Sequence, residues 1–81
     1  MGSKKKNSKP DNHNNNNEDF REMILIAIED ELAAAAMYAT MATMVENRVI
    51  QSLMFNIAGE EFSHARTFMI IYQLLDCVKT V

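Results

Sequence analysis

A long helical pattern with a single interruption most constrains what this chain can fold into. From residue 20 to residue 45 the sequence contains neither glycine nor proline, and it includes the run Ala33-Ala34-Ala35-Ala36, built from the strongest helix former. Glu46-Asn47-Arg48 breaks the pattern, and Asn47 can end one helix or cap the next. A connection this short makes two helices antiparallel neighbours. The sequence therefore predicts an all-α fold, an antiparallel two-helix hairpin.

The helix boundaries follow from the residues at each end. Asn17 or Asp19 can serve as the N-cap, so we expect the first helix to start near residues 18–20. The second helix is expected from about residue 49 to residue 76 or 79. Gly59 interrupts it at a cost of about 1 kcal/mol relative to alanine. This glycine marks either a close helix contact or a position where neighbouring elements hold the helix.

Residues 1–19 are a different kind of segment. They are rich in lysine and asparagine and contain one apolar residue, Met1, so they bury too little surface to offset the entropy of ordering. We predict a disordered tail over residues 1–19 and a helical domain over residues 20–81. The tail is either a solubilising arm or an address that docks the protein to a larger assembly. It is not a secretory signal, because no apolar segment follows its lysines.

The helical region is too apolar for a hairpin that stands alone. Of its 62 residues, 38 are apolar, well above the roughly 45–50% usual in soluble domains. Two helices cannot cover this much apolar surface, so we expect self-association. The longest apolar stretches, residues 23–28 and 32–38, are far shorter than the roughly 20 residues of a membrane-spanning helix. We therefore expect no membrane segment.

Charge and cysteine content narrow the function classes. Residues 20–81 carry four basic and eight acidic residues, a balance that argues against nucleic acid as a partner and suits a protein that attracts cations. Cys77 is the only cysteine, so one chain can form neither an internal disulfide nor a cysteine-based zinc or iron–sulfur site. This composition fits a reducing compartment, the cytoplasm.

Three side chains of the metal-binding types interrupt the apolar pattern. Glu61 and His64 form an E-x-x-H sequence, and a spacing of three puts both on one face of a helix. Glu31 stands alone in an otherwise apolar stripe of the first helix. Two carboxylates and an imidazole directed toward a core need a partner, and a metal ion satisfies all three. The alternative is a salt-bridged or solvent-facing cluster. The other members of the two stripes are Ile24, Ala27, Ile28, Ala34, Ala35 and Tyr38, and Met54, Ile57, Ala58, Ala65 and Phe68.

One chain supplies half of a known type of centre. Di-iron carboxylate bundles use a glutamate from each of two helices and a Glu-x-x-His motif from each of two others. A two-fold dimer of this chain would supply four carboxylates and two imidazoles, which balance two Fe(II) ions, and would bury the excess apolar surface. We therefore expect Glu31, Glu61 and His64 to bind iron between two chains, with manganese as the next choice.

The same residues resemble a known family. The stretch Ile28-Glu29-Asp30-Glu31-Leu32-Ala33-Ala34-Ala35-Ala36-Met37-Tyr38, followed by Glu60-Glu61-Phe62-Ser63-His64-Ala65, is similar to the ferritin-like superfamily. It most resembles rubrerythrins and half-length encapsulated ferritins, over about residues 20–76. The resemblance implies dimerisation into a ferritin-like four-helix bundle, ligand roles for Glu31, Glu61 and His64, and a place for Tyr38 close to the site. It also implies rings of dimers that oxidise Fe(II) with dioxygen or peroxide and pass iron to a storage shell.

The sequence departs from both groups. It contains no second hairpin and no rubredoxin-like cysteine module, and it ends at Val81 without the extension that targets encapsulated ferritins to their shell. We expect a cytoplasmic homodimer that assembles into a larger even-numbered oligomer, either free or inside an encapsulin-like shell.

Residues around the triplet have more ordinary interpretations. Tyr38 is either a hydrogen-bond donor or electron relay beside the metals, or a core residue. Glu60 points about 100° away from Glu61 and is expected on the surface, as are Glu29 and Asp30 unless they form a path for cations. Adaptable core or interface packing is expected of Met37, Met41 and Met44, and a small buried hydrophobe at Cys77.

These observations favour a di-iron ferroxidase that oxidises Fe(II) to Fe(III) for iron storage or detoxification, with Glu31, Glu61, His64 and Tyr38 as its catalytic residues. Two alternatives stay open. A peroxide reductase of the rubrerythrin kind would react far faster with peroxide than with dioxygen. A non-catalytic helical oligomerisation module or shell component would assemble fully without metal and would lack oxidase activity.

Overall fold

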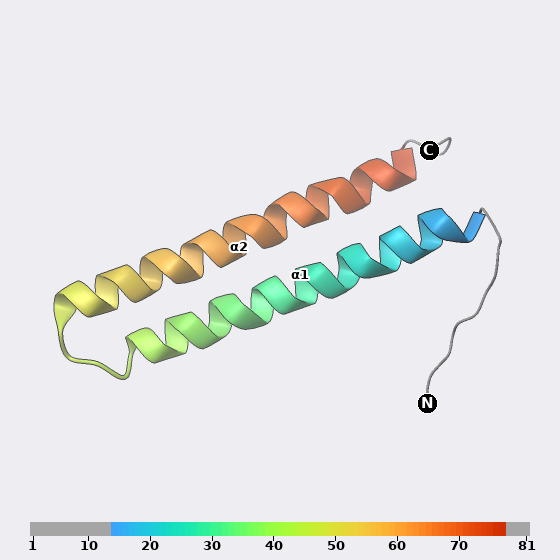
Figure 1. The fold of residues 1–81 in the computed structure, drawn as a ribbon. Coiled ribbons are helices and arrows are strands. Elements are labelled where there is room, and N and C mark those ends of the chain that lie inside the picture. The colour runs from blue at the N-terminus through green and yellow to red at the C-terminus, as the bar shows by residue number, and fades with distance from the viewer. Residues whose placement is uncertain (1–13, 78–81) are drawn as a thin grey trace, which may run out of the picture.

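The chain forms a hairpin of two long antiparallel helices in a computed structural model that describes residues 14–77 (Figure 1). Helix α1 spans Asn14–Ala42 and helix α2 spans Arg48–Cys77. Within the described range the structure contains helices and no strand. The predicted all-α hairpin is confirmed, and its pairing into a four-helix bundle stays a prediction.

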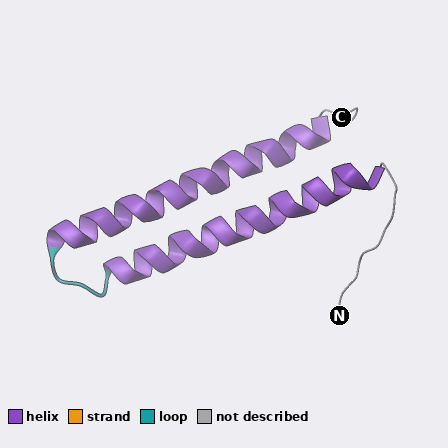
Figure 2. Cartoon of the chain, viewed as in Figure 1, coloured by secondary structure: helices purple, strands orange, loops and turns teal. Residues whose placement is uncertain are grey.

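A short loop joins the two helices (Figure 2), and the side chain of Asn47 holds it to the start of α2. Its Oδ1 accepts a hydrogen bond from the backbone N–H of Ile50 at 2.9 Å, and its carbonyl accepts one from Gln51 N–H at 2.9 Å. This is the N-cap arrangement, which satisfies a backbone donor that the first turn of a helix leaves unpaired. Gln51 also donates its side-chain amide to the carbonyl of Val45 at 3.0 Å. Of the two roles considered for Asn47, the structure therefore selects the cap of α2.

The start of α1 differs from the prediction. The helix begins at Asn14, so residues 14–19, assigned above to the tail, are helical. Asparagine in a helix costs at most about 0.7 kcal/mol relative to alanine, and no glycine or proline lies between Pro10 and Phe20 to stop the helix. The remaining tail residues 1–13, with His13, and residues 78–81 lie outside the described part of the chain.

The core between the helices is small. Its buried apolar residues are three from α1 and two from α2, and no large side chain in the described range is fully buried. Sixteen large apolar side chains are exposed instead, as expected for a hairpin that covers only one side of each helix. The chain therefore presents its apolar surface outward. The buried residues are Ile24, Ile28, Ala42, Ala58 and Ala65.

A polar contact joins the two helices at the open end of the hairpin, the end opposite the turn. Arg21 Nη1 lies 2.8 Å from Asp76 Oδ1, and the guanidinium Cζ lies 5.1 Å from the centroid of the Tyr72 ring. The hydrogen bond to Asp76 is the largest cause of a raised pKa of Arg21, followed by the one to Tyr72. The spacing of residues along the sequence does not predict this contact, because the contact depends on which residues of the two helices are level with each other.

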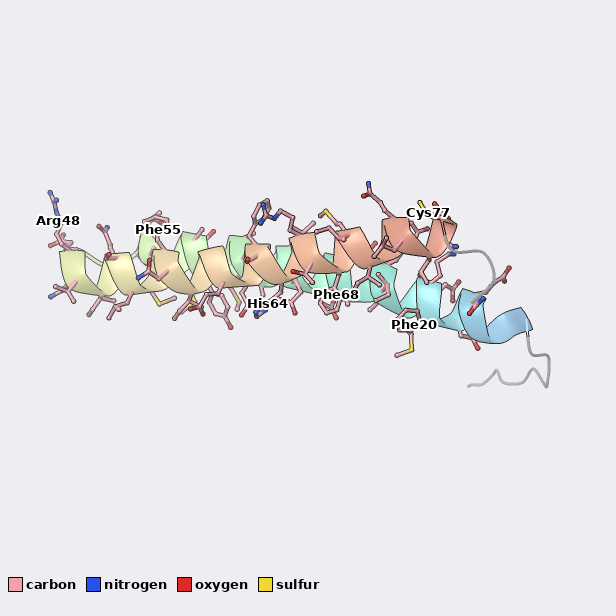
Figure 3. The ribbon with its side chains drawn as sticks, turned by 90° about the horizontal axis from the view of Figure 1, so that it is seen from above. Phe20, Arg48, Phe55, His64, Phe68 and Cys77 are labelled. Carbon is pink, nitrogen blue, oxygen red and sulfur yellow. The ribbon has the colours of Figure 1, made fainter. Side chains whose placement is uncertain are left out.

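The hairpin has two broad faces, on opposite sides of the seam between its helices (Figure 3). Residues seven positions apart lie on nearly the same side of a helix, because seven residues are about two helical turns. We call such a set a row, and on α2 rows of this kind lie on both sides of the buried Ala58 and Ala65. His64, Phe68 and Phe20 point to one side, and Phe55 and Arg48 to the other (Figure 3). We call the first the His64 face and the second the Phe62 face. By helical spacing, the exposed large apolar residues of the His64 face are Phe20, Met23, Met37, Met41, Ile50, Leu53, Ile57 and Leu74, and those of the Phe62 face are Leu25, Phe55, Phe62 and Met69.

Candidate metal centre

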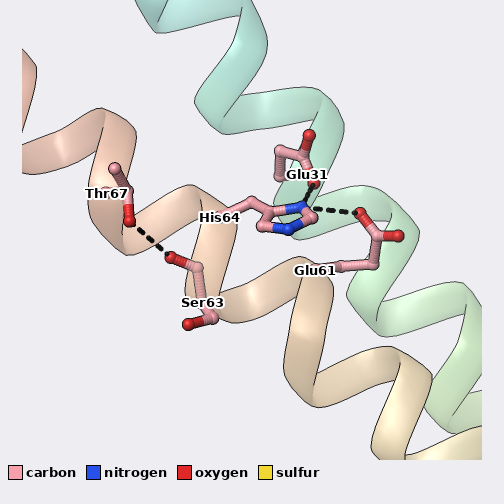
Figure 4. Close-up of polar contacts among 5 residues, drawn as sticks. All are labelled: Glu31, Glu61, Ser63, His64 and Thr67. Carbon is pink, nitrogen blue, oxygen red and sulfur yellow. Dashed lines mark hydrogen bonds and ion pairs between the residues drawn. The ribbon is translucent and has the colours of Figure 1, made fainter.

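The hairpin brings three predicted ligands together near the middle of the His64 face (Figure 4). Glu31 extends from α1, and Glu61 and His64 extend from α2 one turn apart. His64 Nδ1 lies 3.4 Å from Glu31 Oε1 and 3.9 Å from Glu61 Oε1. One ligand atom from each residue lies within 4.8 Å of the other two. Such a cluster can close on one cation with modest side-chain movement.

The three side chains differ in exposure. The Glu31 and Glu61 side chains are 24% and 25% exposed, and the His64 side chain is 61% exposed. Glu31 Oε1 is itself buried and makes no hydrogen bond within the described residues. His64 Nδ1, at 3.4 Å, lies beyond the usual distance of an N–H···O hydrogen bond. A buried carboxylate oxygen without a partner is costly, and a cation would remove that cost.

The two carboxylates interact with each other. The pKa of Glu61 is raised above its ordinary value of 4.5, chiefly because a protonated Glu61 can share its hydrogen with Glu31, then because of burial and the negative charge of Glu31. The charge of His64 acts in the opposite direction and is smaller. Glu61 therefore holds a proton more readily than an isolated glutamate does. A divalent cation bound between the two carboxylates would relieve the same repulsion.

Residues beside the cluster do not extend it. Thr67 Oγ1 donates to the backbone carbonyl of Ser63 at 3.2 Å, within α2 (Figure 4). Tyr38 is half-buried two turns beyond Glu31 on the same row of α1, so its catalytic role stays a prediction. Glu60 is exposed, as predicted, and so are Glu29 and Asp30.

Two packing predictions meet different outcomes. Met37, Met41 and Met44 are 52%, 41% and 73% exposed, so in the single hairpin they fill no core, and their role in an interface stays a prediction. The prediction that Cys77 is buried is wrong, since Cys77 is exposed. It follows Ile70, itself 53% exposed, by seven residues, and this row of α2 points away from α1.

Comparison with protein-family models, with curated proteins and with solved structures finds no match to this chain. The ferritin-like resemblance therefore rests on the residues quoted for it. Neither α1 nor α2 is long and apolar enough to cross a membrane.

Proposed function

We propose that Glu31, Glu61 and His64 bind Fe(II) and that the chain oxidises it to Fe(III), as the ferritin-like resemblance implies. The observation that carries the proposal is the convergence of two carboxylates and an imidazole within 4.8 Å, one carboxylate oxygen being buried without a hydrogen bond. Oxygen and imidazole donors suit iron and manganese, and they are poor ligands for soft ions such as Cu(I).

The charge distribution supports a cation at this position. The His64 face carries Glu31 and Glu61 at its centre and Asp30 and Glu60 at its flanks, and by helical spacing no lysine or arginine of the described residues lies on it. Arg66, two residues from His64, lies by helical spacing on the other side of α2, and Arg21 pairs with Asp76 at the open end. Negative charge that no basic residue balances attracts cations to the site.

The exposed surface supports a site shared by two copies. Three ligands from one chain leave an iron ion open to water, and His64 is mostly exposed. Eight large exposed apolar side chains lie along the same face. A second copy docked through this face would bury them and add a second set of ligands. Two Fe(II) ions would then be balanced by four carboxylates, with an imidazole for each ion.

The chemistry requires a small set of actions from these residues. Each Fe(II), the substrate, gives up one electron, and two Fe(II) ions with two protons convert dioxygen to hydrogen peroxide, leaving two Fe(III). Glu31 and Glu61 favour this change because carboxylates stabilise the more highly charged ion more strongly. His64 orients the site, and the surrounding apolar residues limit access of water. Fe(III) then leaves the site to be stored, so the reaction would serve iron storage or detoxification.

Oxygen uptake after addition of Fe(II) tests the proposal, with neighbouring glutamates as a matched pair. Glu61→Gln should lower the initial rate at least about tenfold, since even residues that only orient a ligand contribute roughly 10- to 100-fold. Glu60→Gln makes the same chemical change one residue away and should retain the rate. Equal rates for the two variants would refute the assignment. Uptake replaced by a much faster reaction with added peroxide would instead identify a peroxide reductase.

A further inference from the structure

The Phe62 face is an apolar surface that the proposed metal centre does not use. Leu25, Phe55, Phe62 and Met69 are 40%, 50%, 54% and 37% exposed there. It lies on the opposite side of the hairpin from His64 (Figure 3), so a second copy on the His64 face leaves it uncovered. Contiguous exposed apolar residues of this kind are typical of an interaction surface.

Gly59 indicates that another helix comes close to this face. It lies four residues after Phe55 and three before Phe62, so it belongs to the same side of α2. Glycine inside a helix costs about 1 kcal/mol relative to alanine. A Cβ added to Gly59 would meet no atom within 4 Å, so nothing in the hairpin requires a glycine. A neighbour from outside the hairpin supplies a physical reason for it.

The charged residues of the Phe62 face are Glu22 and Glu29 on α1, and Arg48 and Arg66 on α2 with Asp76, which pairs with Arg21. Glu29 lies between Leu25 and Leu32 in helical steps, and Arg66 lies between Phe62 and Met69. Neither Glu29 nor Arg66 has an ion-pair partner within residues 14–77. Of these two, the acidic side chain belongs to α1 and the basic side chain to α2. This arrangement is complementary to itself when α1 of one copy meets α2 of another.

The contact between Glu31 and His64 establishes which residues are level across the hairpin. Because the helices are antiparallel, moving two residues back from Glu31 in α1 and two residues forward from His64 in α2 leads in the same direction along the hairpin. Glu29 and Arg66 therefore lie at the same height along its long axis, and we call such residues level. Seven-residue steps from that pair give the other members of the rows that contain Glu29 and Arg66. The level pairs are Glu22 with Gln73, Glu29 with Arg66, and Ala36 with Gly59.

We propose that a second copy of the chain docks on the Phe62 face, independently of the metal centre, about a two-fold axis parallel to the helices. Such an axis exchanges the helices and preserves the level of each residue. It places Glu29 against Arg66 of the second copy, and Ala36 against Gly59 of the second copy, where two small residues allow close approach. The inner rows then match Leu32 with Phe62 and Ala39 with Phe55, so bulky residues of α2 meet smaller ones of α1.

The other face-to-face symmetry fits the residues less well. A two-fold axis perpendicular to the helices packs α1 against α1 and α2 against α2. On this face α1 carries Glu22 and Glu29 with no basic residue, so the acidic rows would meet without compensation. On this face α2 carries Arg48 and Arg66, and its one acidic residue, Asp76, is paired with Arg21. Packing α2 against α2 would therefore bring basic residues together without compensation. Charge therefore selects the parallel axis.

A bulky residue at Gly59 tests the interface without threatening the hairpin. Leucine is a good helix former, and the space around Gly59 is open, so Gly59→Leu should fold normally by circular dichroism. Two symmetry-related clashes should weaken association at least about tenfold. Sedimentation of the full chain in excess chelator measures the association. Asn56→Leu, on the row of α2 that contains Ile70 and points away from α1, is the control. Wild-type chain that remains a single-chain species, or equal behaviour of the two variants, overturns the proposal.

Charge exchange tests the pairing itself. Glu29→Arg and Arg66→Glu should each weaken association on the order of tenfold, because a like-charge pair occurs twice in each interface. The double variant restores opposite charges and should recover most of the wild-type association. A double variant no better than the singles overturns the pairing. All measurements use metal-free protein, so loss of iron oxidation in the Glu61 variant has no bearing on their outcome.

Discussion

His64 Nδ1 lies 3.4 Å from Glu31 Oε1, although the two residues are more than thirty positions apart and belong to different helices. This contact reports the register of the hairpin. The same register gathers the three candidate ligands on one face and makes Glu29 level with Arg66 on the other. The cation site and the proposed docking surface are therefore consequences of one alignment.

A divalent cation that cannot be oxidised should stabilise the hairpin. Zn(II) at about 100 times its dissociation constant should contribute about 2.7 kcal/mol, which raises the melting temperature by about 10–20 °C for a domain of this size. His64→Ala should lose most of the rise, and its fold should survive because the side chain is largely exposed. Thermal melts with and without Zn(II) measure the difference. An unchanged rise in the variant would exclude His64 as a ligand.

The metal-free protein should lose stability as the pH rises. The folded-state pKa of Glu61 is above its ordinary value of 4.5 because of Glu31, so the folded chain binds this proton more tightly than the unfolded chain. The stabilising contribution is complete below pH 4.5 and is lost as the pH rises through the raised pKa. Glu61→Gln should flatten this part of the profile, whereas Glu46→Gln, at the exposed turn, should not. Urea unfolding in chelator at several pH values gives the slopes.

The turn should depend on one side chain. Asn47 caps α2 by accepting a hydrogen bond from Ile50 N–H, so Asn47→Ala should lower the free energy of unfolding by about 1 kcal/mol. Asn56 is exposed and lies well inside the length of α2. Asn56→Ala should be neutral or slightly stabilising, because alanine is the better helix former. Denaturant titration of both variants checks the contrast. Similar losses at the two positions would show that Asn47 has no special role.

A neutral polar side chain on the His64 face should impair the shared centre. Ile57 and Ile70 are both exposed, at 37% and 53%, but Ile57 lies on the row of His64, seven residues before it, and Ile70 lies on a row that points away from α1. Ile57→Gln should weaken the docking of a second copy over the site and should lower Zn(II) affinity at least about tenfold, without adding a charge that attracts the cation. Ile70→Gln should leave the affinity unchanged. Calorimetric titration tests this, and equal affinities for the two variants would indicate a site that one chain completes alone.

Several features were predictable because they depend on local geometry. The absence of glycine and proline from residues 20–45 predicts a long first helix, and Glu46-Asn47-Arg48 predicts the position of the turn to within a few residues, since α1 ends at Ala42 and α2 begins at Arg48. The first helix was predicted too short, since an asparagine run disfavours a helix by too little to end it. The burial of Cys77 was predicted wrongly, because residue type says nothing about which side of α2 meets α1.

The sequence by itself determined that Glu61 and His64 share a side of one helix, because 3.6 residues per turn bring positions three apart together. It also determined that the chain has more apolar surface than two helices can cover. The contacts of Glu31 with this pair and of Arg21 with Asp76, and the equal level of Glu29 and Arg66, follow from how α1 packs against α2. Those relationships depend on the turn length and on the rotation of each helix about its axis, which local spacing leaves open.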